Sequence, residues 1–293
     1  MQIVEIVTGA DVKGLKAIVA SVETKTAKNG KNYLSGLLMD QSGTIGFKVW
    51  DNIPLMTPLL AAGNVVEVKS GAVEEYLGTL SIKLASVVAL PKTEASTYVQ
   101  QAPVPFDDLK TKLEAALKEL KLEECIEKLQ KLGIWDKFLT LPAAMSHHHA
   151  YIHGLLQHTL EVYEGAMLLA NMQKRYHNLD IDKTVLGAAA LFHDIGKIFE
   201  YDINDCNLFT KFNDDGILLG HHFISANIAS KVLQKLVDPI QSKRITHCIL
   251  SHHGRLEWGA AVVPKTPEAY LLHLADMASS QPISAANEPK PLY

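Results

Sequence analysis

The sequence predicts a multidomain protein in which an all-β barrel in residues 1–90 precedes an all-α helical bundle in residues 105–280. Length is the first observation, because 293 residues are enough for two domains with separate cores. The second is patterning: short β-branched or alternating runs fill the first part, whereas apolar residues at helical spacing fill the second. The third is the Pro-rich segment 91–104, which is typical of an exposed linker.

Five runs in the first part have the composition of strands, and turn sequences separate them at KNGKN, DQSGT, AAGN and YLGT. The predicted strands are residues 15–26, 32–40, 43–51, 63–76 and 79–90. Residues 52–63 are expected to form a short helix between the third and fourth strands, with Gly63 as its stop. A five-stranded barrel with a helix at this position is the pattern of an OB fold, whose face often stacks single-stranded bases on aromatic side chains.

The candidate nucleic-acid-binding residues of this barrel are aromatic or basic. Base stacking is assigned to Tyr33, Phe47, Trp50 and Tyr76, and phosphate contact to Lys25, Lys28, Lys31 and Lys48. Packing in the barrel core is an equal alternative for Tyr33 and Trp50. Eight lysines in residues 1–90 are matched by eight acidic residues, so we expect a modest affinity that falls with rising salt.

The whole chain has a net charge of −4 and a pI of about 6.3, which argues against nucleic-acid binding chiefly through a strong positive field. The N-terminus lacks the basic start and apolar core of a signal peptide, and no window approaches the roughly 18 apolar residues of a membrane span. We therefore expect a cytoplasmic protein with no membrane partner. The three scattered cysteines, without CxxC spacing, are expected to be reduced core thiols, and the Pro-rich tail 281–293 to be loosely ordered.

Ten of the thirteen histidines lie in four clusters between His147 and His253. In LFHDIGK, His193 and Asp194 are adjacent, so on a regular helix their side chains would point about 100° apart. They can meet one ion only where the helix ends, and Gly196 is expected to give the backbone freedom to turn there. One imidazole and one carboxylate with positions left for water indicate a hydrolytic metal site rather than a closed structural one.

Other candidate ligands lie on helices that are expected to approach a common core: His158, His221, His252 and Asp276. A carboxylate inside an apolar helix costs several kcal/mol unless it is paired or metal-bound, and the helix of Asp276 offers no Lys or Arg nearby. With His193 and Asp194, this set could hold two divalent ions that share Asp194. Two ions about 3.5–4 Å apart suit displacement at phosphorus.

The order H…HD…H…H…D, with HDIGK at its centre, resembles the HD-domain phosphohydrolase superfamily. The segments HHAYIHGLLQHTLEV, LLGHHFIS, LSHHGRLEWGAAVVP and LLHLADM resemble YhaM-type 3′-to-5′ exoribonucleases, in which an OB-fold domain precedes the HD domain, and the resemblance covers nearly the whole chain. It implies a helical HD fold, divalent metal, and hydrolysis of RNA, or single-stranded DNA, from the 3′ end. Manganese is the ion that the family favours, with iron, cobalt, nickel or magnesium as alternatives.

Residue by residue, the resemblance implies six metal ligands: His158, His193, Asp194, His221, His252 and Asp276. His221 is preferred to His222 because the family's histidine directly follows the glycine that matches Gly220, and His252 is preferred to His253 for the analogous reason. The resemblance also implies catalytic roles for Asp194 and for Lys197, which matches the lysine after HD.G and would contact the substrate phosphate or orient the attacking water. One departure is His153, which stands where the family usually has glycine.

Four further histidines are candidates for substrate contact: His148, His149, His222 and His253. For the last two, a role as polar groups at helix ends is an equal alternative. We expect His247 and His273 to be core or supporting residues, and Trp135 and Trp258 to pack in the interior.

The leading hypothesis is thus a metal-dependent 3′-to-5′ exoribonuclease. The alternatives are an HD-type nucleotide phosphohydrolase or phosphodiesterase, and a nucleic-acid-binding adaptor with an inactive metal site. A cyclic-dinucleotide phosphodiesterase usually carries HHE followed by GYP, and HHGRLEWGAAVVP lacks both. The sequence leaves the subunit number open, a homo-oligomer included.

Overall fold

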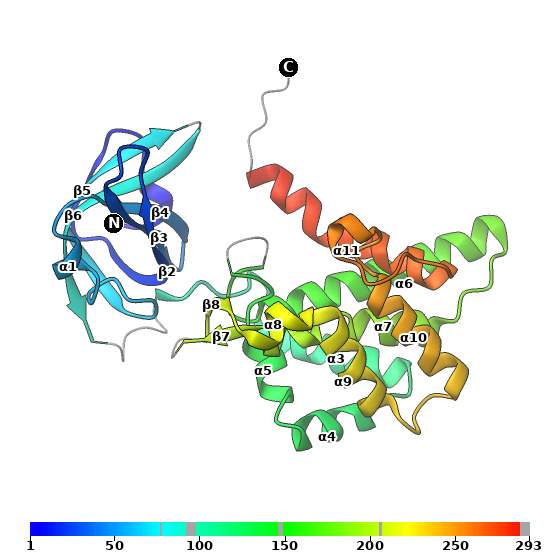
Figure 1. Ribbon diagram of the computed structural model, residues 1–293. Coiled ribbons are helices and arrows are strands. Elements are labelled where there is room, and N and C mark those ends of the chain that lie inside the picture. The colour runs from blue at the N-terminus through cyan, green and yellow to red at the C-terminus, as the bar shows by residue number, and fades with distance from the viewer. Residues whose placement is uncertain (77, 92–97, 146–148, 205–206, 288–293) are drawn as a thin grey trace. The chain divides into compact units, whose positions relative to one another are not determined.

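The computed structural model describes residues 1–76, 78–91, 98–145, 149–204 and 207–287. The chain divides into two compact units: Met1–Gln101 with Ile203–Thr210, and Ala102–Asp202 with Lys211–Tyr293. In Figure 1 the strands of the first unit run from blue to cyan, and the helices of the second from green to red. Within the described part of the chain, no helix is both long enough and apolar enough to cross a membrane.

The first unit is built on a closed five-stranded barrel (Figure 1). Its strands are β2 (Lys16–Thr26), β3 (Asn32–Asp40), β4 (Gly43–Val49), β5 (Val65–Tyr76) and β6 (Thr79–Leu90). Antiparallel pairing joins β2 to β3 and β3 to β4, β4 pairs with β6 in parallel, and β5 closes the barrel by pairing with both β6 and β2. This strand order is that of an OB fold, as the sequence predicts.

Alternation along the strands fills the barrel interior, because successive side chains point to opposite faces. In β4, Ile45, Phe47 and Val49 are buried while the residues between them are partly exposed. Gly36 on the paired strand leaves room for the Phe47 ring, since a Cβ at Gly36 would lie 2.6 Å from it. The interior of the barrel therefore depends on one strand having no side chain opposite its largest aromatic residue.

Three short elements complete this unit: η1 (Ile3–Glu5), β1 (Asp11–Val12), which pairs with β5, and α1 (Ile53–Met56). Buried Asp40 fixes the turn from β3 to β4, because its carboxylate accepts hydrogen bonds from the backbone nitrogens of Ile3 (2.8 Å) and Ser42 (2.7 Å). The helix expected over residues 52–63 is only the single turn α1. Pro58 follows it closely and has no backbone N–H to continue the helical hydrogen bonding.

The second unit is mainly helical. Its helices are α3 (Phe106–Glu119), α4 (Glu124–Lys131), α5 (Trp135–Thr140), α6 (Gly154–His177), α7 (Lys183–Phe192), η3 (Ile195–Phe199), α8 (Asp214–Leu218), α9 (Gly220–Leu233), α10 (Pro239–Ser251), η4 (Leu256–Trp258) and α11 (Pro267–Asn287). Helix α7 is central, since every residue from Val185 to Phe192 is buried, and α6, α9, α10 and α11 all contact it. Helix α11 starts at Pro267, and proline is favoured at the first position of a helix, where its missing N–H would have no partner in any case.

Two features differ from the helical pattern expected for residues 105–280 and the loose tail expected after them. A two-stranded hairpin of β7 (Tyr201–Ile203) and β8 (Phe209–Phe212) interrupts the helices, and the rings of Tyr201 and Phe212 pack against each other at 4.6 Å. Helix α11 continues through Pro282 to Asn287. A proline removes one helical hydrogen bond, but the alanines that follow favour helix, so the helix extends beyond residue 280. Residues 92–97 of the expected linker and 288–293 of the expected tail lie outside the described residues.

Two of the three cysteines, Cys125 and Cys248, are described, and both are buried free thiols. Burial raises the pKa of each thiol to about 12. Both side chains are therefore neutral and unreactive at neutral pH, as expected of core thiols. Cys206 lies outside the described residues.

Candidate metal centre

Helix α7 ends immediately before His193 and Asp194, and the chain then tightens into the 3₁₀ turn η3. Asp194 takes φ −111° and ψ 3°, which departs from regular helix and lets its side chain face the same region as that of His193. The conformational role expected for Gly196 is wrong, because its φ is not in the left-handed region. A Cβ there would lie 2.5 Å from the carbonyl oxygen of His221 and 2.8 Å from Ser225 Oγ. Gly196 instead allows η3 to lie directly against α9.

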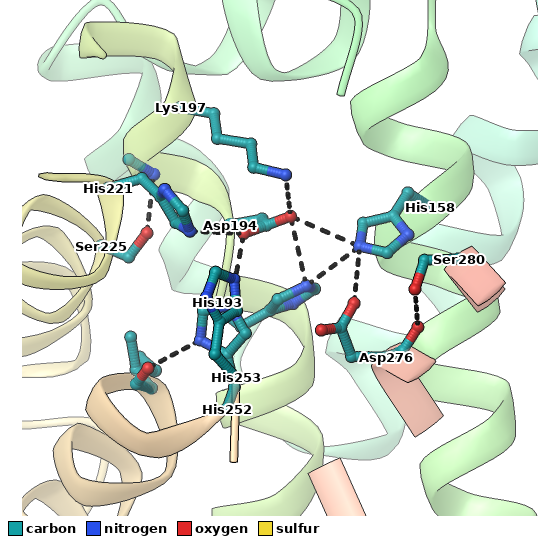
Figure 2. A network of polar contacts seen from close by, with 12 residues as sticks. His158, His193, Asp194, Lys197, His221, Ser225, His252, His253, Asp276 and Ser280 are labelled. Atoms are coloured by element: carbon teal, nitrogen blue, oxygen red, sulfur yellow. Dashed lines mark hydrogen bonds and ion pairs between the residues drawn. The ribbon is translucent and has the colours of Figure 1, made fainter. Parts of the chain in front are cut away.

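One set of side chains gathers at Asp194 Oδ2, and we call this set, His158, His193, Asp194 and Asp276, the carboxylate half of the site (Figure 2). The Nε2 atoms of His158 and His193 lie 3.3 and 3.4 Å from Asp194 Oδ2. Asp276 Oδ1, from α11, lies 3.3 Å from His158 Nε2. The ammonium of Lys197 lies 2.7 Å from the same Asp194 oxygen.

A second set of side chains faces Asp194 Oδ1, and we call its four histidines, His221, His222, His252 and His253, the imidazole half. The Nε2 atoms of His221 and His252 lie 3.5 and 3.6 Å from Oδ1. All four histidines offer a nitrogen within 4.8 Å of the others, so the structure brings together both members of each pair between which the sequence required a choice. Asp194 Oδ1 and His222 Nε2 are buried with no hydrogen-bond partner among the described residues.

Backbone carbonyls orient two of the candidate ligands. His193 Nδ1 donates to the carbonyl oxygen of Ala190 at 2.8 Å, and His252 Nδ1 donates to that of Ile249 at 2.7 Å. Because a carbonyl only accepts, these bonds place the proton on Nδ1 and leave a lone pair on Nε2 in the neutral ring. Such partners on the outer nitrogen are characteristic of metal-binding histidines.

Carboxylates support the rings of the other two candidate ligands, His221 and His158, either directly or through a serine. Glu200 accepts from His221 Nδ1 at 2.9 Å and from the His221 backbone nitrogen at 3.2 Å. On the other side, His158 Nδ1 lies 3.0 Å from Ser279 Oγ, and Ser279 donates onward to Glu161 Oε2 at 2.6 Å. None of these three supporting residues is predicted from the sequence. The only signal in the sequence is that Glu161 lies three residues after His158, which places it on the same face of α6.

The carboxylates of the site are ionised. Burial opposes their charge, but Lys197 and His193 hold the pKa of Asp194 well below its usual value, and hydrogen bonding to His158 lowers the pKa of Asp276. Burial also opposes the charge of His158, yet Asp194 and Asp276 raise its pKa to about 9. A cation bound at this position would replace that proton, because histidine ligates metals in its neutral form.

Three rings of the imidazole half have the opposite tendency. Burial, together with His221 and His253, lowers the pKa of His222 to about 2. Burial and the neighbouring His193 hold the pKa of His252 well below its usual value, and burial and His221 lower the pKa of His253. The rings of His222, His252 and His253 are therefore neutral at neutral pH and present lone pairs. Neutral imidazoles with ionised carboxylates suit divalent transition metals, so the residues present fit a metal site.

The remaining predicted histidines have different positions. His149 is buried, and its Nε2 lies 3.0 Å from Glu161 Oε2, so it contacts the network behind His158. His148 lies outside the described residues. His273 donates from Nδ1 to the carbonyl oxygen of His252 at 2.8 Å, which is the supporting role expected of it.

The backbone conformation at His153 explains why glycine is favoured at this position. Its φ is +65°, in the left-handed region that glycine adopts most readily. The histidine compensates with side-chain contacts, since its ring stacks on Phe106 at 4.5 Å and its Nδ1 donates to the Leu139 carbonyl oxygen at 2.7 Å. It therefore fixes the start of α6, five residues before His158.

A cavity of about 250 Å³ opens beside the carboxylate half. Its lining includes Asp194, Lys197, His252, Trp258, His273 and Asp276. Trp258 is 47% exposed, so the interior packing expected for it is wrong, whereas Trp135 is buried as expected. The position of Trp258 could not be predicted, because a lone tryptophan in a sequence shows no pattern that separates a core residue from a cavity wall.

On the barrel, the structure brings together three of the predicted nucleic-acid-binding residues. Tyr33 and Trp50 stack with ring centroids 4.3 Å apart, and both are partly exposed. Lys48 is partly exposed and lies two residues before Trp50, so it points to the same, outer face of the barrel. Core packing and an outward-facing pair were equal alternatives for the two aromatic residues, and the structure shows the outward-facing pair.

The other barrel candidates have different environments. Phe47 is 1% exposed in the barrel core, so its predicted stacking role is wrong. Its alternation with Ile45 and Val49 places it on the inner face. Tyr76 is exposed at the end of β5, and Lys31 is exposed and pairs with Asp51 at 3.0 Å.

Comparisons with known proteins found one family model and several solved structures. Residues 155–279 match the family model for the HD domain, so the helical unit carries an HD domain. An OB domain from Methanosarcina mazei is 33% identical over 30% of this chain and 80% of its own, with a TM-score of 0.26. A mitochondrial single-stranded DNA binding protein from S. cerevisiae is 20% identical over 28% of this chain and 93% of its own, with a TM-score of 0.24. The HD domain of the L. monocytogenes phosphodiesterase PgpH is 17% identical over 47% of this chain and 74% of its own, with a TM-score of 0.26.

Proposed function

We propose that this protein is a metal-dependent 3′-to-5′ exonuclease that hydrolyses the phosphodiester bonds of single-stranded RNA. One observation carries the proposal: histidine Nε2 atoms from four separate helices or helix ends converge on the two oxygens of a single carboxylate, Asp194. HD domains are typical of metal-dependent phosphohydrolases, and the resemblance to YhaM-type enzymes supports RNA as the substrate and the 3′ end as the point of attack.

Two divalent ions would share Asp194. The carboxylate half would hold one ion through His158, His193 and Asp276, and His221 and His252 would hold the second. When bound, such ions stabilise phosphoryl oxygens as Lewis acids and activate water for attack at phosphorus.

The protein's own side chains position these groups and bind the substrate. Lys197 lines the cavity with its ammonium 2.7 Å from Asp194, and there it would donate to a non-bridging phosphate oxygen. Glu200 holds the ring of His221, and Ser279 holds that of His158. The cavity of about 250 Å³ suits one terminal nucleotide rather than a continuous duplex, which favours attack at a strand end.

The barrel supplies a surface of the kind that binds single strands. The Tyr33–Trp50 pair presents an aromatic surface on the outer face, and Lys48 adds a positive charge beside it. Base stacking tolerates any sequence because every base has a π-face, so this surface suits an enzyme that degrades strands of differing sequence.

The test is digestion of a 5′-labelled single-stranded RNA in the presence of Mn²⁺, with a mononucleotide panel and a matched DNA strand in parallel. We expect stepwise shortening of the labelled RNA with release of mononucleotides. Asp194→Asn should abolish turnover while RNA binding persists. Asp180→Asn is the matched control, because that carboxylate is 98% exposed in the same unit. Cleavage of free nucleotides alone would establish the phosphohydrolase alternative, and RNA binding without turnover the adaptor.

A further inference from the structure

The segment that follows α10 is held firmly beside the metal centre. His253 Nδ1 donates to the carbonyl oxygen of Trp258 at 2.8 Å, which ties the short helix η4 to the imidazole half. Gly254, at φ +80°, packs so closely on His273 that a Cβ would lie 2.4 Å from the ring. The position of Trp258 is therefore set by residues of the metal centre and their neighbours.

A positively charged side chain also lies against the indole ring of Trp258. The guanidinium carbon of Arg255 lies 4.8 Å from the centre of the indole ring, a cation–π contact. Such a contact favours one orientation of the ring. Trp258 is thus held through both its backbone and its side chain, although 47% of it is exposed.

The cavity has two chemically different parts. Asp194, Lys197 and Asp276 make one part charged, and Trp258 gives the other a large aromatic surface. An exposed aromatic side chain in a cavity next to a charged centre is the wall that an amphipathic ligand requires. A nucleotide has this character, since a phosphate is joined through a sugar to a flat aromatic base.

We propose that Trp258 forms a base-binding subsite, in which its indole stacks on the base of the nucleotide whose phosphate lies at the metal centre. The proposal rests on the proposed function, because the metal centre places the phosphate. It assigns the recognition of the reacting nucleotide to the helical unit, separately from any strand binding by the barrel. Stacking on an aromatic side chain corresponds to about 5- to 150-fold in affinity, with little preference among bases.

The experiment compares two ligands that differ only in the base. Adenosine 5′-monophosphate and ribose 5-phosphate are titrated by calorimetry into the Mn²⁺-loaded protein. The wild type should bind the nucleotide at least about fivefold more tightly. Trp258→Ala should remove this preference while leaving the affinity for ribose 5-phosphate unchanged, and Trp258→Phe should retain part of it. Leu256→Ala is the control, because that side chain is 60% exposed on the same short helix and does not line the cavity.

A Trp258→Ala variant with the wild-type preference for the nucleotide would overturn the subsite, as would a wild type that binds both ligands equally. Near-ultraviolet circular dichroism of the variants shows whether the fold is retained. The readout needs no turnover. If the wild type shortened RNA but showed no base preference, the subsite alone would be wrong. If it showed a base preference but did not shorten RNA, only the exonuclease activity would be wrong.

Discussion

The two halves of the metal centre share Asp194 but balance their charges differently. In the carboxylate half, the charges of Asp194 and Asp276 are already countered by Lys197 and His158 at distances of 2.7 to 3.3 Å. Ion pairs therefore stabilise this half before any cation binds. Its side chains are arranged in advance, which lowers the entropic cost of binding a metal.

The imidazole half has no such internal balance. Its four rings lie with centroids 4.1 to 5.8 Å apart, and the only carboxylate that contacts it from behind is Glu200, at His221, among the described residues. His222 Nε2 is buried and has no hydrogen-bond partner among the residues that the structure describes. A buried lone pair without a partner is unfavourable, so this half gains more from a bound cation than the carboxylate half does. A bound metal therefore stabilises the imidazole half more than the carboxylate half.

The largest effect is expected for Asp194→Asn, because that carboxylate serves both halves. An amide offers one weakly basic oxygen in place of two charged ones, so neither ion would be held well. RNA turnover should fall by several orders of magnitude. Metal bound per chain, measured by inductively coupled plasma mass spectrometry, should fall together with it, whereas Asp180→Asn should change neither. A full complement of metal in Asp194→Asn would show that the two halves do not depend on the shared carboxylate.

The next largest effect separates the halves without activity as the readout. In excess chelator, His158→Ala should lower the free energy of unfolding by about 3–5 kcal/mol, because it leaves Asp194 and Asp276 buried with fewer partners. His252→Ala removes a neutral ring from a crowded cluster, so its cost should be only about 1–2 kcal/mol. Urea unfolding measures both. Equal costs would contradict the unequal charge balance of the two halves.

Bound metal should partly reverse this order of stability losses between His158→Ala and His252→Ala. Saturation with Mn²⁺ at about 100 times its dissociation constant adds about 2.7 kcal/mol to the stability of the wild type. For the second unit, this corresponds to a rise in melting temperature of about 5–10 °C. His252→Ala should lose more of this rise than its metal-free stability suggests, because the imidazole half is the one that depends on the cation. Differential scanning calorimetry with and without chelator gives both quantities for each variant.

The residues that could be predicted from the sequence are those with a local signal. Alternation in the barrel strands gives their inner face, and it also shows that Phe47 belongs with Ile45 and Val49, although its aromatic character suggested stacking. The order of histidines and aspartates along the chain identified six candidate ligands that the fold brings to one place. The preference for His221 over His222 stays a prediction, because the start of α9 and the end of α10 meet with both pairs of rings in contact.

The supporting residues had no such signal apart from the spacing of Glu161 from His158. Ser279 reaches Glu161 across 118 positions of sequence, and the contact exists only because α11 packs on α6. A serine in an apolar helix and a glutamate on a long helix are each ordinary surface or cap residues until that packing is known. The cavity beside Trp258 has the same origin, since its walls come from four separate segments. Tertiary packing therefore decides which polar residues become part of the site.

Glu200 gives a smaller prediction within the imidazole half. Glu200→Ala removes the acceptor from His221 Nδ1, so the ring loses its orientation and its fixed tautomer. Turnover or metal affinity should fall by about 10- to 100-fold. Glu200→Gln, which keeps a neutral acceptor, should recover much of the loss. If the alanine and glutamine variants were equally impaired, the role of Glu200 would lie in its charge and not in the orientation of the ring.

The smallest effect is expected for Glu161→Gln, because Glu161 reaches His158 only through Ser279. Its effect on turnover should be below that of Glu200→Ala, and it should appear instead in the acid stability of the fold. Burial opposes ionisation of Glu161, but hydrogen bonds from His149 and Ser279 lower its pKa to about 2 from 4.5. The folded pKa lies below the unfolded one, so this carboxylate stabilises the fold fully above about pH 4.5 and loses that contribution as the pH falls towards 2. Thermal unfolding between pH 6 and pH 3 should therefore decline less steeply in Glu161→Gln than in the wild type, with Glu164→Gln, an exposed carboxylate on the same helix, as the control. Identical slopes in the variant and the wild type would mean that hydrogen bonds do not hold the Glu161 carboxylate ionised. The two halves of the site would then differ only in their candidate metal ligands.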